Sequence, residues 1–192
     1  MHEKISRDHM HIIKPQKVIL TDFPASGYVL DIGGGGEGII GLMKPEQVVA
    51  IDHKKSELEE APPGPSKIVM DATDLQFLNE SFSTVTSFFS LMFIKPGEKR
   101  NVFQEVYRVL QEEGHFLIWD AIIPPRDNHE EQWFVVPLQI EIGNTSIETA
   151  YGVGWAVRTQ NMKDIEKLAE EIGFTIIETK KKDQIFFYDF LK

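Results

Sequence analysis

A run of glycines is the segment of this chain whose residue types are most suited to binding chemistry. Residues 29–38 read Val-Leu-Asp-Ile-Gly-Gly-Gly-Gly-Glu-Gly, so a short apolar run leads directly into four glycines. Glycine lets the backbone turn tightly, and it lets a ligand approach where a Cβ would otherwise stand. The amide groups at the start of the helix expected next would face that ligand. The order of strand, glycine loop and helix therefore predicts a small-molecule site.

Two acidic residues narrow the chemistry of the ligand. Gly33, Gly35 and Gly38 have the spacing of the dinucleotide fingerprint, with Asp52 at the end of the next apolar run. A nicotinamide-dependent oxidoreductase is therefore one reading of the loop. Asp31 argues against it, because a pyrophosphate has little use for a carboxylate directly before the glycines. A ligand with an ammonium and a sulfonium group, and no phosphate, suits that carboxylate better.

Three segments resemble motifs of the class I S-adenosylmethionine-dependent methyltransferases, of the small-molecule-type subgroup. Residues 29–35 look like motif I, and residues 49–52 look like the second motif, in which an acid holds the ribose hydroxyls. Residues 70–72 resemble the third motif, where an Asp and its neighbour lie against the adenine. Residues 102–120 resemble the characteristic helix and fifth strand of the family. The resemblance implies a sheet of seven strands in which the last strand is antiparallel.

The same resemblance implies S-adenosyl-L-methionine as the cofactor and methyl transfer to a small-molecule acceptor. The cofactor-binding residues it implies are Asp31, Gly33, Gly34, Gly35, Asp52, His53, Asp71, Ala72, Phe89 and Ser90. Asp52 and Asp71 also have purely local readings, as caps of the turns that follow them. The proline-containing strand-four motif of many relatives is missing, which leaves open a protein that binds the cofactor without transferring a methyl group.

Glu37 stands where the family usually has its third glycine, so an unusual arrangement is expected at the methionine end of the site. Glu37 either favours the helix N-terminus electrostatically or contacts the ligand.

The sequence contains no recognisable catalytic dyad, and methyl transfer need not use one. Displacement from a sulfonium depends largely on positioning and desolvation. His129 and Tyr151 are the candidates for removing a proton from an oxygen or nitrogen acceptor. His2, His9 and His11 lie near one another in the sequence, but no partner stands at ligand spacing, so no metal site is predicted.

The elements that position these residues follow from hydrophobic patterning. Short apolar runs predict strands at residues 28–32, 48–52, 67–70, 84–89 and 115–121, and helical spacing predicts helices at 98–113 and 162–172. The second helix has Asn161 as its N-cap, and Gly114 is expected to end the first. Strand-like runs at 174–179 and 184–191 are too close for a parallel crossover, so they predict a hairpin. We expect an α/β fold, a Rossmann-like seven-stranded sheet of five parallel strands closed by an antiparallel hairpin, with helices on both faces.

Residues 123–160 are expected to form a β-ribbon insertion within a single domain of residues 1–192. The insertion has β-type runs near 133–142 and 150–158, and it carries Trp133, Tyr151 and Trp155 among acids. It leaves the carboxyl edge of the sheet, where ligands bind in open α/β folds. One reading is a lid over the acceptor pocket. The other is a ribbon packed against the sheet or a second subunit, which would make the protein a homo-oligomer.

Composition excludes several partners. Lys plus Arg number 20 against 30 Asp plus Glu, and a net charge of −10 disfavours a nucleic acid as the main partner. No apolar run approaches the roughly 20 residues of a membrane span, so no membrane association is expected. The chain has no cysteine, which excludes disulfides and thiolate metal sites. Together with a polar start at residues 1–4, this favours a cytoplasmic protein.

Overall fold

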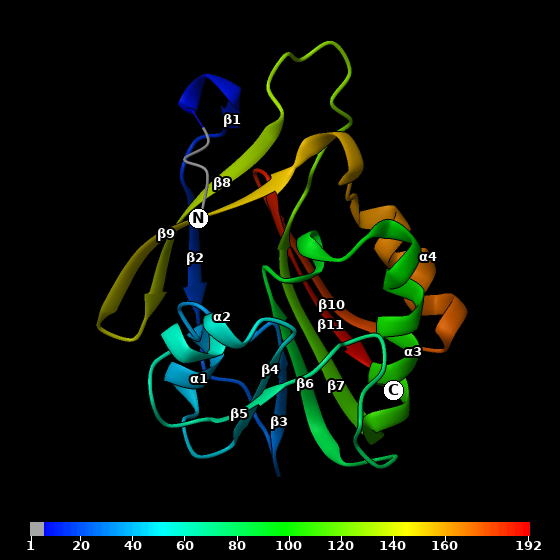
Figure 1. Cartoon of the computed structure of the whole chain (residues 1–192). Coiled ribbons are helices and arrows are strands. Elements are labelled where there is room, and N and C mark those ends of the chain that lie inside the picture. Colours follow the sequence, from blue (N-terminus) through cyan, green and yellow to red (C-terminus); the bar gives the residue numbers. More distant parts are fainter. Residues whose placement is uncertain (1–5) are drawn as a thin grey trace.

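Two β-sheets and four α-helices make up the part of the chain that the computed structural model describes, residues 6–192 (Figure 1). The expectations for His2 and for the polar start of the chain lie outside these residues. The larger sheet has seven strands in the order β10-β11-β7-β6-β3-β4-β5. Its strands are β3 (Val29–Ile32), β4 (Val48–Asp52), β5 (Ser66–Val69), β6 (Phe82–Phe88), β7 (Leu110–Ala121), β10 (Thr175–Lys182) and β11 (Ile185–Leu191).

Helices cover both faces of the larger sheet, as expected for parallel strands that are apolar along their whole length. On one face, α3 (Lys99–Val109) and α4 (Met162–Ile172) pack over β6, β7 and β11. On the other, the short α1 (Ile39–Met43) and α2 (Lys55–Glu60) cover β3 and β4, and residues of the second sheet complete the same apolar cluster (Figure 1). All four residues of β3 are buried. This confirms the expected α/β class.

The closing hairpin is confirmed, and its last strand lies inside the sheet. β11 runs antiparallel to both β7 and β10, so five parallel strands are followed by a reversed one. The turn lies at Asp183, whose φ of 51° is left-handed. Lys180–Lys182, expected in the turn, continue β10 instead. The strand is an exposed edge, where lysines remain solvated and discourage pairing with another chain.

The two long helices differ in how well their ends were predicted. α4 matches expectation: the Asn161 side chain accepts a hydrogen bond from the Asp164 amide at 3.0 Å, and Gly173 ends the helix. α3 ends at Val109, several residues earlier than expected, because Leu110 is buried and pairs with Phe82 in β6. The prediction that Gly114 ends this helix is therefore wrong.

The insertion and the N-terminal segment together build the second sheet. β8 (Trp133–Ile142) and β9 (Thr145–Gly154) form a long antiparallel ribbon, while β1 (Met10–Ile12) and β2 (Gln16–Leu20) pair in parallel with successive parts of β8. The sequence patterns had predicted no N-terminal strand. A pair of hydrogen bonds between the backbones of Ile123 and Gln160 closes the base of the insertion. Across residues 6–192, no helix has both the length and the apolar character needed to cross a membrane.

Candidate functional site

The glycine loop brings the ends of three strands into contact. Gly33 lies against the side chain of Ser90, beyond β6. A Cβ on Gly34 would lie 2.6 Å from Oδ2 of Asp31, and one on Gly35 would lie 3.1 Å from Oδ2 of Asp52. Real Cβ contacts are longer than the first of these, so the loop requires glycine where it crosses the acidic residues. The structure thus gathers most of the predicted cofactor residues around one loop.

Three amides of the glycine loop donate hydrogen bonds within the protein. The Gly33 and Gly34 amides donate to the Ile51 carbonyl at 2.9 and 3.0 Å, and the Gly36 amide donates to the Glu57 carbonyl at 2.8 Å. α1 is also only five residues long. The carboxylates beside the loop are therefore its main polar groups for a ligand, and they match hydroxyls and cations better than phosphates.

Asp31 lies beneath the loop rather than on its surface. Its side chain is almost fully buried and accepts a hydrogen bond from the Thr86 hydroxyl at 2.8 Å. Burial raises the pKa of Asp31 to about 7; the Thr86 bond opposes this rise and the nearby negative charge of Asp52 adds to it. Asp31 is thus poised to gain or lose a proton near neutral pH, and a positive charge placed over the loop would favour its ionised form.

Asp52 ends β4 with one carboxylate oxygen bound locally and the other directed at the loop. Its Oδ1 accepts the Lys54 amide at 2.8 Å and lies 3.4 Å from Nδ1 of His53, whose side chain is exposed. Its Oδ2 lies 3.1 Å from the position that a Cβ on Gly35 would take. The local turn and a ligand contact are therefore compatible in this residue.

Asp71 has the local role that the sequence left open. Its Oδ1 accepts from both the amide and the hydroxyl of Thr73, each at 2.8 Å, and these bonds lower the pKa of Asp71. The residue follows β5, directly beyond the bond from the Met70 amide to the Asp52 carbonyl at 3.0 Å. Asp71 and Ala72 therefore stand at the same sheet edge as Asp52.

Phe89 and Ser90 form a strained turn beyond β6. Phe89 has a φ of 48°, a conformation that bulky residues rarely adopt, and its amide donates to the Trp119 carbonyl at 2.7 Å. Its ring is buried and stacks on Tyr151 of β9, with ring centroids 5.9 Å apart. The turn places the end of β6 between the glycine loop and the ribbon.

Glu37 joins the ribbon to the glycine loop. Its carboxylate accepts hydrogen bonds from the Tyr151 hydroxyl at 2.8 Å and from the Thr149 hydroxyl, both on β9. This contact gives a reason for Glu37 at the position where the family usually has its third glycine. It differs from the two roles considered above, an electrostatic effect on the helix N-terminus and a contact with the ligand. Burial and the charge of Glu37 raise the pKa of Tyr151 well above its ordinary value. The phenol therefore stays protonated at neutral pH and acts as a hydrogen-bond donor.

A buried polar cluster at the end of β7 was not predicted. Asp120 accepts from the amides of Met92 and Ala121 at 3.2 and 2.7 Å and from the Gln160 side chain at 2.9 Å. The Lys99 ammonium donates to the Gln160 side-chain oxygen. Burial raises the pKa of Asp120 to about 6 and lowers that of Lys99. The only signal of this cluster in the sequence was the acidic residue Asp120 within an otherwise apolar run.

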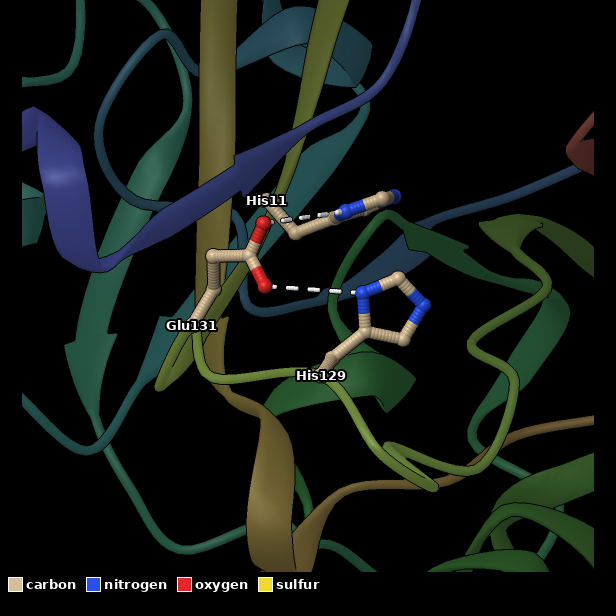
Figure 2. Close-up of side chains that lie close together, drawn as sticks. All are labelled: His11, His129 and Glu131. Carbon is tan, nitrogen blue, oxygen red and sulfur yellow. Dashed lines mark ion pairs between the residues drawn. The ribbon is translucent and has the colours of Figure 1, made fainter.

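His129 and Trp155 pack against each other. Trp155 is 1% exposed, and its indole donates to the Pro124 carbonyl at 2.7 Å. The His129 ring packs on Trp155 and lies beside His11 and Glu131 (Figure 2). Trp155 is therefore part of the apolar cluster between the two sheets. The partners of His11 were missed because they lie far along the chain.

A separate hollow of about 350 Å³ lies between β2 and the face of β7 and β11. Phe23, Trp119 and Phe187 are among the residues that line it, and residues of the glycine loop are not. It is distinct from the candidate site.

Comparison with known proteins adds a family to this geometry. Residues 30–118, from β3 to β7, match the family model described as a methyltransferase domain. Among curated proteins, none is similar enough to this chain to count as a relative.

Several solved structures share the fold. The PH0226 protein of Pyrococcus horikoshii OT3 is 21% identical with a TM-score of 0.63, over 86% of this chain and 82% of that one. An S-adenosylmethionine-dependent methyltransferase from Methanosarcina mazei is 18% identical with a TM-score of 0.64, over 88% and 94%. Another from Clostridium acetobutylicum ATCC 824 is 16% identical with a TM-score of 0.63, over 86% and 83%. At these identities the similarity concerns the fold.

Proposed function

We propose that the chain is a class I S-adenosylmethionine-dependent methyltransferase and that it methylates a small-molecule acceptor held under the β8–β9 ribbon. The observation that carries the proposal is the contact of Tyr151 with Glu37 and Phe89, which joins the ribbon to the loop expected to hold the cofactor. A nicotinamide-dependent oxidoreductase finds no support in the family match.

In this proposal, different residues around the glycine loop bind different parts of the cofactor. Asp52 binds the ribose hydroxyls through Oδ2, and Asp71 and Ala72 lie along the adenine. Asp31 supplies negative charge beneath the methionine part. The remaining contacts come from Gly33, Gly34, Gly35, His53, Phe89 and Ser90. The bound cofactor supplies a methyl group on a positively charged sulfur, which leaves as a neutral thioether.

The ribbon acts as a lid in this proposal. Phe89 stacks on one side of Tyr151, and Phe93 meets the same ring edge-on with centroids 6.3 Å apart. This packing excludes water from the end of β6, and a dry site favours displacement at a charged centre. Thr149 and Tyr151 of β9 contact Glu37 of the glycine loop in the same chain. The insertion therefore serves as a lid within one chain and need not be a subunit interface.

The charges near Tyr151 favour a neutral or cationic acceptor. Glu37, Asp31 and Glu57 all act on the Tyr151 phenol through their negative charges. An anionic acceptor would be repelled by this cluster. Because the phenol stays protonated, Tyr151 positions the lid and the acceptor rather than removing a proton. His129, packed on Trp155, is likewise not used as the base. The net charge of −10 and the absence of cysteine support a cytoplasmic enzyme without a nucleic-acid partner.

Thermal unfolding with S-adenosylhomocysteine, the cofactor's product, tests the cofactor. At 100 times its dissociation constant a ligand adds about 2.7 kcal/mol, and each kcal/mol raises the melting temperature by roughly 2–4 °C in a domain of this size. An upward shift of about 5–10 °C is expected, with none for NAD.

Asp52→Ala should weaken binding of S-adenosylhomocysteine by about 1.5–3 kcal/mol, the scale of hydrogen bonds to a charged group. The control is Glu59→Ala, which removes an exposed acid from α2. A larger shift with NAD would refute the cofactor assignment.

Hydrogen exchange of the β9 amides and an acceptor screen test the lid. Tyr151→Phe removes the bond to Glu37 and keeps the ring on Phe89, so the ribbon should open about tenfold more often, as expected for losing about 1.5 kcal/mol. Affinity for S-adenosylhomocysteine should stay within about twofold, or about 0.4 kcal/mol. Turnover of acceptors found in the screen should fall. Tyr28→Phe, on an exposed tyrosine, is the control. Unchanged exchange and turnover would show that the ribbon is not a lid.

A further inference from the structure

We propose that His11, His129 and Glu131 form a binding site for a divalent transition metal, best suited to Zn²⁺. Figure 2 shows the three side chains converging from β1 and from the loop that precedes β8. Nδ1 of His129 lies 3.4 Å from one Glu131 oxygen, and Nδ1 of His11 lies 3.8 Å from the other. Each side chain offers one ligand atom, and these three atoms all lie within 4.8 Å of one another.

These separations are close to what zinc requires. Zinc binds histidine nitrogen and carboxylate oxygen at about 2.0–2.2 Å, and tetrahedral angles then put neighbouring ligand atoms about 3.3–3.6 Å apart. The His129–Glu131 distance already lies in this range, and the His11–Glu131 distance, to the other carboxylate oxygen, exceeds it by a few tenths of an ångström. The widest separation among the ligand atoms, at most 4.8 Å, must shorten by up to about 1.2 Å through side-chain rotation when the metal binds. Two imidazoles and one carboxylate leave a fourth position open. Side-chain exposures of 33% for His11 and 45% for His129 allow solvent to reach it.

The backbone holds the three ligands in place without the metal. β1 pairs with the start of β8, and the Gln132 amide donates to the His9 carbonyl at 2.8 Å. The Arg126 guanidinium donates to the carbonyls of His129 and Glu130, both at 3.0 Å, and so fixes the loop between β7 and β8. A metal would therefore meet ligands that have already lost much of their conformational freedom.

Aromatic packing orients both imidazoles. The rings of His11 and His129 lie 4.8 and 4.7 Å from that of buried Trp155, and His11 also stacks on Phe134 at 5.7 Å. Fixed rings of this kind increase affinity because less side-chain entropy is lost on binding. The donor set favours Zn²⁺ over Mg²⁺ and Ca²⁺, which prefer sites built of oxygen. The site would tie the N-terminal strand to the base of the β8–β9 ribbon.

Equilibrium dialysis of the metal-free full chain against ZnCl₂, followed by metal analysis, tests the site. One Zn²⁺ per chain should be retained, and MgCl₂ should not compete. His129→Gln and Glu131→Gln should each weaken binding by about 100-fold or more, because losing even an outer partner of a ligand costs 10–100-fold. His9→Gln is the matched control: it changes a neighbouring histidine outside the cluster and keeps the backbone bond to Gln132.

Visible absorption of the wild type with CoCl₂ provides a readout that does not depend on the folding of any variant. Co²⁺ replacing Zn²⁺ in a site of few ligands should give the intense absorption of tetrahedral cobalt, and ZnCl₂ should abolish it. The proposal is overturned if wild type retains no more Zn²⁺ than folded His129→Gln, if His9→Gln loses the metal equally, or if Co²⁺ gives only its weak aqueous spectrum. In those cases the cluster is a pair of histidines that lie within ion-pair distance of Glu131.

Discussion

Replacing Asp31 by Asn should stabilise the protein above neutral pH, although Asp31 lies at the centre of the candidate cofactor site. In the folded state the pKa of Asp31 is about 7, against an ordinary value of 3.8. Between these values the folded chain keeps a proton that the unfolded chain has lost. Raising the pH through this interval therefore destabilises the fold.

The size of the effect follows from the pKa difference. Each unit corresponds to about 1.4 kcal/mol, so three units amount to about 4 kcal/mol by pH 8. Asn has the same shape, cannot ionise, and its oxygen can still accept the Thr86 hydroxyl bond. Asp31→Asn should thus match wild type near pH 4 and exceed it by up to about 4 kcal/mol at pH 8. That difference corresponds to roughly 8–16 °C in melting temperature.

Urea unfolding at a series of pH values from about 4 to about 8.5 measures this difference directly. Asp120, with a pKa of about 6, adds its own pH dependence to both proteins, so the difference between the two curves isolates Asp31. Asp183→Asn, in the exposed hairpin turn, is the control and should leave the curve unchanged. A stability curve for Asp31→Asn parallel to that of wild type, or lower at pH 8, would refute the reasoning.

The same variant should bind S-adenosylhomocysteine more weakly, since it removes the negative charge beneath the loop. A buried acid that lowers stability and supports binding is the expected trade-off at a functional site. Titration calorimetry at pH 8, where the wild-type carboxylate is ionised, gives the clearest comparison. Equal affinity would assign Asp31 a purely structural role.

Three further changes test the packing around the site. Lys99→Met should destabilise the folded protein by about 3–5 kcal/mol because it leaves Asp120 buried without a cation. The double variant with Asp120→Asn should recover much of this loss, and thermal unfolding of both variants measures it. Gly34→Ala should cost about 1–3 kcal/mol by forcing a Cβ against Asp31, and it should abolish the melting shift with S-adenosylhomocysteine. Asn161→Ala should cost about 0.5–2 kcal/mol of stability through loss of the cap of α4, and it should keep the melting shift with S-adenosylhomocysteine. If Gly34→Ala and Asn161→Ala lost this shift equally, Gly34 would act only on stability.

Local chemistry was sufficient for the elements of the larger sheet. Continuous apolar runs indicated the parallel strands, and the short gap after residue 179 excluded a crossover, so the hairpin could be predicted. Asn161 and Gly173 defined α4 because capping depends on neighbours in the chain. The end of α3 could not be obtained this way, since Leu110 remains compatible with a helix until Phe82 of another strand pairs with it.

The sequence by itself determined the glycine loop and the acid at the end of β4, because strand, turn and acid are adjacent or follow one another in a regular order. Only the tertiary structure decided what lies across from them. Tyr151 meets Glu37 from 114 positions away, and His11 meets His129 because β1 pairs with β8. Hydrophobic patterning reports which face of a strand is buried and says nothing about which strand will be its neighbour. The contacts that join the ribbon to the site therefore depend on strand pairing, which is settled only when the whole chain has folded.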